Sequence, residues 1–254
     1  EKHIGKIGTA KTTLPPSNFG IGHTRWATHG GVTDLNAHPH LDCTQKISVI
    51  HNGIVENSDE IKKRLLKKGH KFLSETDTEV IPHLIEDNKK NNNFETAVKK
   101  TFKEMTGLNA IVAADSESNE IIAAKNGSPL IVGEKNGEYY LASDASALIP
   151  HTRFLFFVED DMLVAINEKL KVISLKGDRV IKPNFEQVDW EIEEVEIGTH
   201  KHFMVKEIHE QPRVIRNIAK NYDKEIILLS EIIKRSKGTF FIGAGTAFHA
   251  CLAG

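Results

Sequence analysis

Apolar and polar positions divide the chain into stretches of different periodicity. Residues 46–51 (KISVIH) form a short apolar run that ends at Asn52-Gly53, a dipeptide typical of tight turns, which predicts a strand. Between residues 57 and 105, apolar residues recur every three or four positions, the spacing of one face of a helix. From residue 108 to 183, short apolar runs alternate with turn dipeptides, which is typical of consecutive strands.

The helical stretch carries start and stop signals. Asn57 with Glu60 predicts a capping box, and Gly69 predicts the end of that first helix. Thr76 with Glu79 repeats the pattern before a second helix. Pro82 lies inside the second helix, so that helix should be kinked or begin later than the cap suggests. Residues 94–105 predict a third helix.

Seven β-type runs follow, and most are succeeded directly by another strand, so we expect antiparallel pairing. The runs are NAIVAAD, NEIIAAK, SPLIVGE, YYLAS, FLFFVED, MLVAIN and LKVISL. Further on, residues 222–235 predict a helix, and residues 239–245 (TFFIGAG) predict a strand.

Composition narrows the class of protein. A formal net charge of −2 in 254 residues gives no electrostatic reason to expect nucleic acid or an anionic membrane as a partner. No apolar run is long enough to span a membrane. Two cysteines, Cys43 and Cys251, are too few for a disulfide framework and fit a reducing cytosol. We therefore expect a cytoplasmic globular protein.

Residues 23–53 hold the densest candidate chemistry. Four of the 13 histidines lie in one 18-residue window of this stretch: His23, His29, His38 and His40. One interpretation is a zinc site formed by His29, His38, His40 and His51. The H-x-H spacing has no carboxylate or thiolate nearby, and Cys43 stands isolated in the sequence, so we predict no metal. The other interpretations are incidental histidines in a surface loop and a polar pocket built on loops.

The mixture of groups supports a pocket. Arg25 offers a fork of donors that fits a carboxylate, and Trp26 offers a flat apolar wall. Asn52 next to Gly53 combines a side-chain amide with a main-chain N–H, a plausible oxyanion hole. Asp77 can pair with an ammonium group or simply favour the start of a helix. Such a pocket suits a free α-amino acid whose side-chain carbonyl is attacked.

Motifs along nearly the whole chain resemble one family. They are GHTRWATHG, NAHPH, HNGIVEN, SETDTEV, NGSPLIVG, LASDASALIP and KEIHEQP, in this order. The chain resembles the glutaminase domain of the glutamine–fructose-6-phosphate aminotransferases (glucosamine-6-phosphate synthases), which are class II (Ntn-type) glutamine amidotransferases. Trp26 distinguishes it from phosphoribosyl-pyrophosphate amidotransferases, which usually carry Tyr there.

The resemblance implies an α+β fold, a four-layer αββα sandwich, followed by the start of an α/β sugar-isomerase (SIS) domain. It implies hydrolysis of L-glutamine to glutamate and ammonia, which a complete SIS domain uses to convert fructose 6-phosphate to glucosamine 6-phosphate. It implies no cofactor and a homodimer as the full-length protein. We expect a glutaminase domain at 1–183, a linker at 184–225 and the beginning of the SIS domain at 226–254.

The resemblance also implies roles for individual residues. The glutamine α-carboxylate would bind Arg25, with Thr28 and His29 on the same side, and the α-ammonium would bind Asp77. Asn52 and Gly53 would hold the oxyanion. Trp26 would gate ammonia escape, and His38 would sit in the pocket's loop. A weaker sugar-phosphate assignment falls on Thr246, which is followed by Ala247 where the family usually has Ser. Ser143 and Asp144 are expected to be structural.

This chain differs from the family at the position of the nucleophile. The family uses an N-terminal Cys whose α-amine acts as the base, whereas residue 1 here is Glu1. Cys43 is not a substitute, because it precedes the oxyanion strand and has no terminal amine. We therefore expect a fragment that is inactive alone. The alternatives are a non-catalytic glutamine-binding regulatory module and a class II amidotransferase with a different acceptor.

Overall fold

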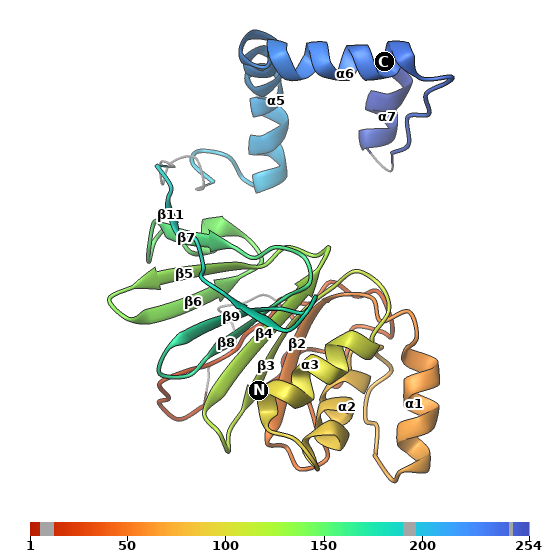
Figure 1. Ribbon diagram of the computed structural model, residues 1–254, viewed down its shortest axis with the longest axis vertical. Coiled ribbons are helices and arrows are strands. Elements are labelled where there is room, and N and C mark those ends of the chain that lie inside the picture. The colour runs from red at the N-terminus through yellow and green to blue at the C-terminus, as the bar shows by residue number, and fades with distance from the viewer. Residues whose placement is uncertain (6–12, 190–196, 244–245, 254) are drawn as a thin grey trace. The chain divides into compact units, whose positions relative to one another are not determined.

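The computed structural model describes residues 1–5, 13–189, 197–243 and 246–253. The chain forms two compact units, residues 1–190 and residues 191–254, which are described separately (Figure 1). Within the described residues, 1–5 and 13–39 contain no helix or strand.

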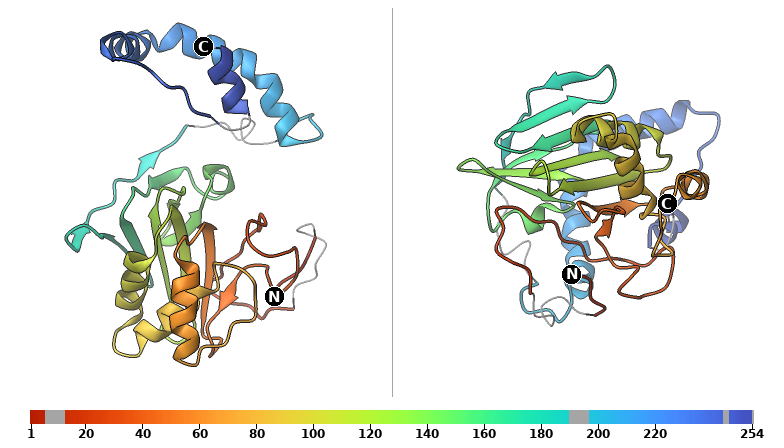
Figure 2. Two further views of the ribbon diagram at one scale, coloured as in Figure 1. Left: turned by 90° about the vertical axis from the view of Figure 1, so that its right-hand side faces the viewer. Right: turned by 90° about the horizontal axis from the view of Figure 1, so that it is seen from below.

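The first unit consists of three layers (Figures 1 and 2). Helices α1 (Ser58–Lys67), α2 (Val80–Lys89) and α3 (Phe94–Glu104) cover one face of a seven-stranded sheet. A four-stranded sheet packs against the opposite face of that sheet. The mixed α/β character expected from the sequence is confirmed.

Both sheets are built from antiparallel pairs, as the succession of strands predicts. The order in the large sheet is β1-β2-β3-β4-β8-β9-β10, and in the small sheet β11-β7-β5-β6. The strands of the large sheet are β1 (His40–Leu41), β2 (Ile47–Gly53), β3 (Asn109–Asp115), β4 (Glu120–Asn126), β8 (Met162–Ile166), β9 (Leu170–Ser174) and β10 (Arg179–Ile181). Those of the small sheet are β5 (Ile131–Lys135), β6 (Glu138–Ala142), β7 (Phe154–Phe157) and β11 (Glu186–Gln187).

Strand β3 explains why the large sheet lies in the middle. All seven of its residues are buried. Because successive side chains point to opposite faces, Ile111 and Ala113 pack against the helices, while Val112 packs against the small sheet. A strand that is buried on both faces has no polar alternation, which is the pattern of NAIVAAD.

The helix starts differ from the capping predictions. Asn57 makes no capping hydrogen bond. Its side chain instead donates to Glu104 O at 2.9 Å and accepts from Thr106 N–H at 3.1 Å, because the end of α3 lies beside it. The second helix begins at Val80, later than Thr76 suggests, which places Pro82 in the first turn where its missing N–H costs nothing.

The second unit contains three helices within its described residues: α5 (Phe203–Asn221), α6 (Asp223–Arg235) and α7 (Thr246–Ala253). Helix α6 confirms the prediction for 222–235. Helix α5 was not predicted, and it occupies nearly half of the segment expected to be a linker. None of the described helices combines the length and apolar content needed to cross a membrane.

The strand predicted at 239–245 is wrong where the structure describes it. Residues 239–243 have no strand conformation, and residues 244–245 lie outside the described residues. A strand is stabilised by hydrogen bonds to a neighbouring strand. The described residues of this unit form helices and coil, so its apolar run has no such neighbour.

Candidate active site

A cavity of about 230 Å³ lies where the loop after residue 22, the end of β2 and the segment before α2 meet. This volume is below the roughly 300–1,000 Å³ of sites for drug-sized molecules and suits a small polar ligand. The lining residues are His23, Thr24, Arg25, Trp26, Thr28, His38, His51, Asn52, Gly53, Thr76, Asp77 and Thr78.

The end of β2 supplies three neighbouring residues that serve different purposes. His51 points toward the helical layer, where its Nδ1 lies 2.9 Å from Thr78 Oγ1 and its Nε2 lies 2.8 Å from Asn109 Oδ1. Asn52, the next residue, must point to the opposite face of the sheet. Gly53 has φ +130°, and a Cβ there would lie 2.2 Å from Leu108 O, so the position requires glycine.

His23 orients the side chain of Asn52. Its Nε2 lies 2.8 Å from Asn52 Oδ1, and because an amide oxygen only accepts, His23 donates this hydrogen bond. The His23 ring stacks on His38 at 4.2 Å between centroids. Burial lowers the pKa of His23, which keeps the ring neutral. Since Oδ1 is engaged by His23, the amide Nδ2 of Asn52 is left to donate to a ligand.

Arg25 is both a loop-forming residue and a source of free donors. Its guanidinium donates to Gly31 O at 2.9 Å, to Gly30 O at 3.3 Å and to His29 O. An arginine has five N–H donors, so these three hydrogen bonds leave two donors within the part of the chain that the structure describes. Arg25 therefore closes the loop 25–31 and can still bind a carboxylate.

Asp77 brings a buried carboxylate to the same cavity. Its Oδ2 accepts the backbone N–H of Val55 at 2.8 Å, and its side chain is 6% exposed. Its Oδ1 lies 3.8 Å from Nδ1 of His29. The carboxylate is therefore held through Oδ2 by the backbone, while Oδ1 lies near His29.

Burial keeps His38, His40 and His51 neutral. Burial, reinforced by the nearby His23, lowers the pKa of His38 to about 2. Burial also lowers the pKa of His40 to about 3, and its Nε2 lies 3.1 Å from Thr76 Oγ1. Burial likewise lowers the pKa of His51. These rings can donate or accept hydrogen bonds at neutral pH but add no positive charge.

A second cavity of about 380 Å³ adjoins the first and shares His23, Thr24, His51 and Asn52 with it. It opens between the two sheets, where Ile50 and Val112 of the large sheet face Leu130 and Leu141 near the small one. Ser143 lines this second cavity. Asp144 caps the short helix η1 (Ala145–Ala147) by accepting the Ser146 N–H at 2.7 Å, which agrees with the structural role expected for it.

The structure brings most of the predicted site residues together. Arg25, Trp26, Thr28, His38, Asn52, Gly53 and Asp77 line the first cavity, and His29 lies beside Asp77. Trp26 stands at the edge of the cavity, with 88% of its surface exposed. Thr246 is the first residue of α7 in the second unit, and its side chain lies outside the described residues.

Sequence reasoning did not assign five of the lining residues, namely His23, Thr24, His51, Thr76 and Thr78. His23 lay within the histidine cluster, and its position two residues before Arg25 was the available signal. Cys43 is not among the residues that line either cavity. Cys43, which stands isolated in the sequence, contacts His70 and His83 in the structure.

The sequence of one protein family matches half of the chain. The sequence profile of the glutamine amidotransferase domain family matches residues 23–150, which include the cavity-lining residues from His23 to Thr78. This chain belongs to the glutamine amidotransferase domain family. The glutamine amidotransferase domain therefore lies in the first compact unit and contains both cavities.

Curated relatives match the glutamine amidotransferase domain and extend beyond it. Two are named glutamine–fructose-6-phosphate aminotransferase [isomerizing]. The one from Methanothermobacter thermautotrophicus is 42% identical over 260 residues, which cover 100% of this chain and 44% of the relative. The one from Pyrococcus horikoshii is 41% identical, with the same coverage of 100% and 44%. The chain thus spans less than half the length of these relatives.

Solved structures resemble the fold of the amidotransferase domain. Glutamine phosphoribosylpyrophosphate amidotransferase from B. subtilis aligns with a TM-score of 0.52 at 26% identity, over 60% of this chain and 34% of that one. A structure described as the allosteric regulatory enzyme of purine biosynthesis aligns with a TM-score of 0.54 at 28% identity, with the same coverage. The mixed α/β fold is thus similar to that of known glutamine amidotransferases.

Proposed function

We propose that the first cavity binds L-glutamine and stabilises the oxyanion that forms when its side-chain amide is attacked. The main support for this proposal is that Asn52 and Gly53 line the same cavity as Arg25 and Asp77. Free glutamine carries a carboxylate, an ammonium group and a reactive carbonyl. The cavity offers one cationic side chain, one anionic side chain and one pair of donors that match these three groups.

In this proposal each group acts through its own chemistry. The two remaining donors of Arg25 bind the α-carboxylate, a charge-assisted contact stronger than a neutral hydrogen bond. Asp77 binds the α-ammonium. The Asn52 amide and the Gly53 N–H donate to the amide oxygen, and they gain strength as negative charge develops on it. His23 holds Asn52 in the required orientation.

The remaining assignments complete the pocket. Thr28 and His29 support the carboxylate side, and His38 positions the loop that carries it. Trp26, at the exposed edge of the cavity, shields the ligand and governs the escape of ammonia. No cofactor is needed for this chemistry, because the donors and charges are all side-chain and main-chain groups.

For the whole protein we propose glutamine amide-nitrogen transfer to fructose 6-phosphate, which gives glucosamine 6-phosphate and glutamate. The names and the 41–42% identity of the relatives support this acceptor. In the second unit, a Cβ on Gly243 would lie 2.6 Å from the backbone of Ala247, so glycine is required where the chain enters α7. This close approach of Gly243 to Ala247 supports the start of a sugar-isomerase domain, with Thr246 at the helix N-terminus as a phosphate ligand.

The same proposal includes the finer features of architecture and assembly. The three described layers of the first unit support a four-layer αββα sandwich, in which a further helical layer covers the small sheet. We propose a glutaminase domain at 1–183, an interdomain segment at 184–225 and a sugar-isomerase domain from 226 onward. We also propose a cytoplasmic homodimer for the full-length protein.

Calorimetric titration of the chain with L-glutamine tests the proposed site. We expect L-glutamine to bind, and D-glutamine and L-glutamate to bind at least about tenfold more weakly, a difference of about 1.4 kcal/mol. Arg25→Lys should weaken L-glutamine binding, because a lysine lacks the bidentate fork. Arg179→Lys, on the exposed strand β10, is the matched control. Equal affinity for the two enantiomers would refute the assignment of Arg25 and Asp77.

A separate assay tests the acceptor. The full-length gene product, given L-glutamine and fructose 6-phosphate, should produce glucosamine 6-phosphate. Ammonia release from glutamine without amino-sugar formation would be consistent with the proposed glutamine site but would refute fructose 6-phosphate as the acceptor.

A further inference from the structure

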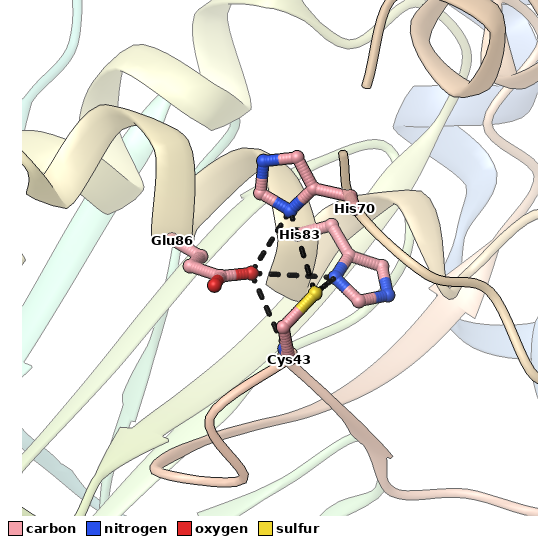
Figure 3. A group of neighbouring side chains, drawn as sticks. All are labelled: Cys43, His70, His83 and Glu86. Atoms are coloured by element: carbon pink, nitrogen blue, oxygen red, sulfur yellow. Dashed lines mark hydrogen bonds and ion pairs between the residues drawn. The ribbon is translucent and has the colours of Figure 1, made fainter. Parts of the chain in front are cut away.

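Four side chains from three separate segments converge at one point (Figure 3). They are Cys43, His70, His83 and Glu86. Each offers one potential ligand atom, and these four atoms lie within 4.8 Å of one another. None of the four residues lines the first or the second cavity.

Of four distances between the ligand atoms, three match those around a tetrahedral zinc ion, and the fourth, between His70 Nδ1 and Glu86 Oε2, is that of a hydrogen bond. With bonds of about 2.3 Å to sulfur and about 2.1 Å to nitrogen or oxygen, neighbouring ligands should lie about 3.6 Å (S to N) and about 3.4 Å (N to O) apart. Cys43 Sγ lies 3.7 Å from His70 Nδ1 and 3.5 Å from His83 Nδ1. Glu86 Oε2 lies 2.9 Å from His70 Nδ1 and 3.4 Å from His83 Nδ1.

The far sides of the two imidazole rings provide an independent observation. His83 is 1% exposed and His70 6% exposed, and the Nε2 atoms of both are buried without a hydrogen-bond partner among the described residues. A carboxylate lies just beyond each: Glu79 Oε1 is 3.8 Å from His83 Nε2, and Asp87 Oδ1 is 3.9 Å from His70 Nε2. Histidines that bind a metal through one ring nitrogen commonly direct the other toward a carboxylate.

The supporting segments are held in place before any ion binds. Cys43 lies in the turn between β1 and β2, where Asp42 Oδ1 accepts the backbone N–H groups of Lys46 and Ile47 at 2.8 and 2.9 Å. His70 lies three residues after the end of α1, and its N–H donates to Leu65 O at 3.1 Å. His83 and Glu86 are three residues apart on α2 and so share a face of that helix.

We propose that Cys43, His70, His83 and Glu86 form a structural zinc site. The thiolate and the carboxylate together balance the charge of a divalent cation. One sulfur, two imidazole nitrogens and one carboxylate oxygen are the ligand types that zinc prefers. With four protein ligands the coordination shell is closed, so the ion ties the β1–β2 turn to α2 and to the end of α1 and takes no part in glutamine chemistry.

Metal content of the 254-residue chain is the first test. Protein purified without chelators from zinc-supplemented medium should contain about one zinc per chain by mass spectrometry. Cys43→Ser should reduce this at least about tenfold, whereas Cys251→Ser, which changes the other cysteine, should retain it. Asp87→Asn should lower zinc affinity roughly 10–100-fold, the usual effect of losing a carboxylate behind a ligand histidine.

Two measurements on the unaltered chain keep the test independent of variant folding. Cobalt added to the chelator-treated protein should produce a thiolate-to-cobalt charge-transfer band and the visible bands of a tetrahedral site. Zinc should slow alkylation of Cys43 at least about tenfold while Cys251, in the same molecule, reacts unchanged. Absence of zinc, cobalt bands and alkylation protection would overturn the proposal. So would equal zinc content in Cys43→Ser and the unaltered chain, because the metal would then be bound elsewhere.

Discussion

Asp77 has two separable purposes in the proposed glutamine site, and two substitutions distinguish them. Its Oδ2 accepts the backbone N–H of Val55 at 2.8 Å, and Val55 is 1% exposed. Asp77→Ala removes the acceptor and leaves a buried N–H without a partner. Asp77→Asn keeps a carbonyl oxygen for the same N–H and removes only the negative charge.

The structure determines how large each effect should be. A hydrogen bond to a charged acceptor contributes about 1.5–3 kcal/mol, so Asp77→Ala should lower the free energy of unfolding by about 2 kcal/mol. For a unit of this size that is roughly 4–8 °C in Tm. Asp77→Asn should cost about 1 kcal/mol or less, because a neutral hydrogen bond replaces the charged one. Both variants should weaken L-glutamine binding at least about tenfold, since the α-ammonium loses its carboxylate.

Thermal unfolding and calorimetric titration of the same samples provide the assay. Asp144→Asn is the matched control, because Asp144 also accepts one backbone N–H, from Ser146 at 2.7 Å, but does not line the first cavity. The control should leave glutamine affinity unchanged. Glutamine affinity within twofold of the unaltered chain in Asp77→Asn would refute the pairing with the ammonium group. Unchanged stability of Asp77→Ala would refute the contribution of the Val55 hydrogen bond.

Three further predictions concern the end of β2 and its surroundings. Gly53→Ala should lower the free energy of unfolding by about 3 kcal/mol in chemical denaturation, because it adds a steric overlap to an unfavourable φ of +130°. Gly137→Ala, at φ +83° with nothing within 4 Å, should cost only about 1–2 kcal/mol. His23→Phe keeps an aromatic ring for stacking but loses the hydrogen bond to Asn52, so glutamine affinity should fall about tenfold with little change in stability. His38 has a folded-state pKa of about 2 against about 6.5 in the unfolded chain, so only the unfolded chain gains a proton as the pH falls below 6.5. The stability that neutral His38 contributes is therefore complete above pH 6.5 and should decline by about 1.4 kcal/mol per pH unit below it.

Each of these predictions has an outcome that contradicts it. Equal losses in Gly53→Ala and Gly137→Ala would show that the overlap at the strand end is relieved without cost. Unchanged glutamine affinity in His23→Phe would show that another group orients Asn52. The pH prediction is checked by urea unfolding at pH 7.5, 6 and 5, with His38→Gln as the comparison. Identical slopes for the two proteins would mean that the His38 pKa is not lowered in the folded state.

Local patterns predicted much of the first unit. NAIVAAD is uniformly apolar because β3 is covered on both faces, and seven predicted strand runs coincide with β3 to β9. Helix α6 and the later start of α2 also follow from short-range signals, since apolar spacing and Pro82 act within a few residues. The capping box of Asn57 failed because the end of α3, distant in sequence, offers its side chain better partners.

The sequence by itself also identified donors and charges of the candidate site, because Arg25, Asn52, Gly53 and Asp77, predicted from short motifs, all line the first cavity. Only the tertiary structure decided how those groups are held. It placed His23 against Asn52, used part of the Arg25 fork to close its own loop, and surrounded Cys43 with His70, His83 and Glu86. Residue identity and local spacing specify which donors and charges are available. Contacts between residues 27 to 43 positions apart, as around Cys43, depend on how helices and strands pack, and that is set by the whole buried core.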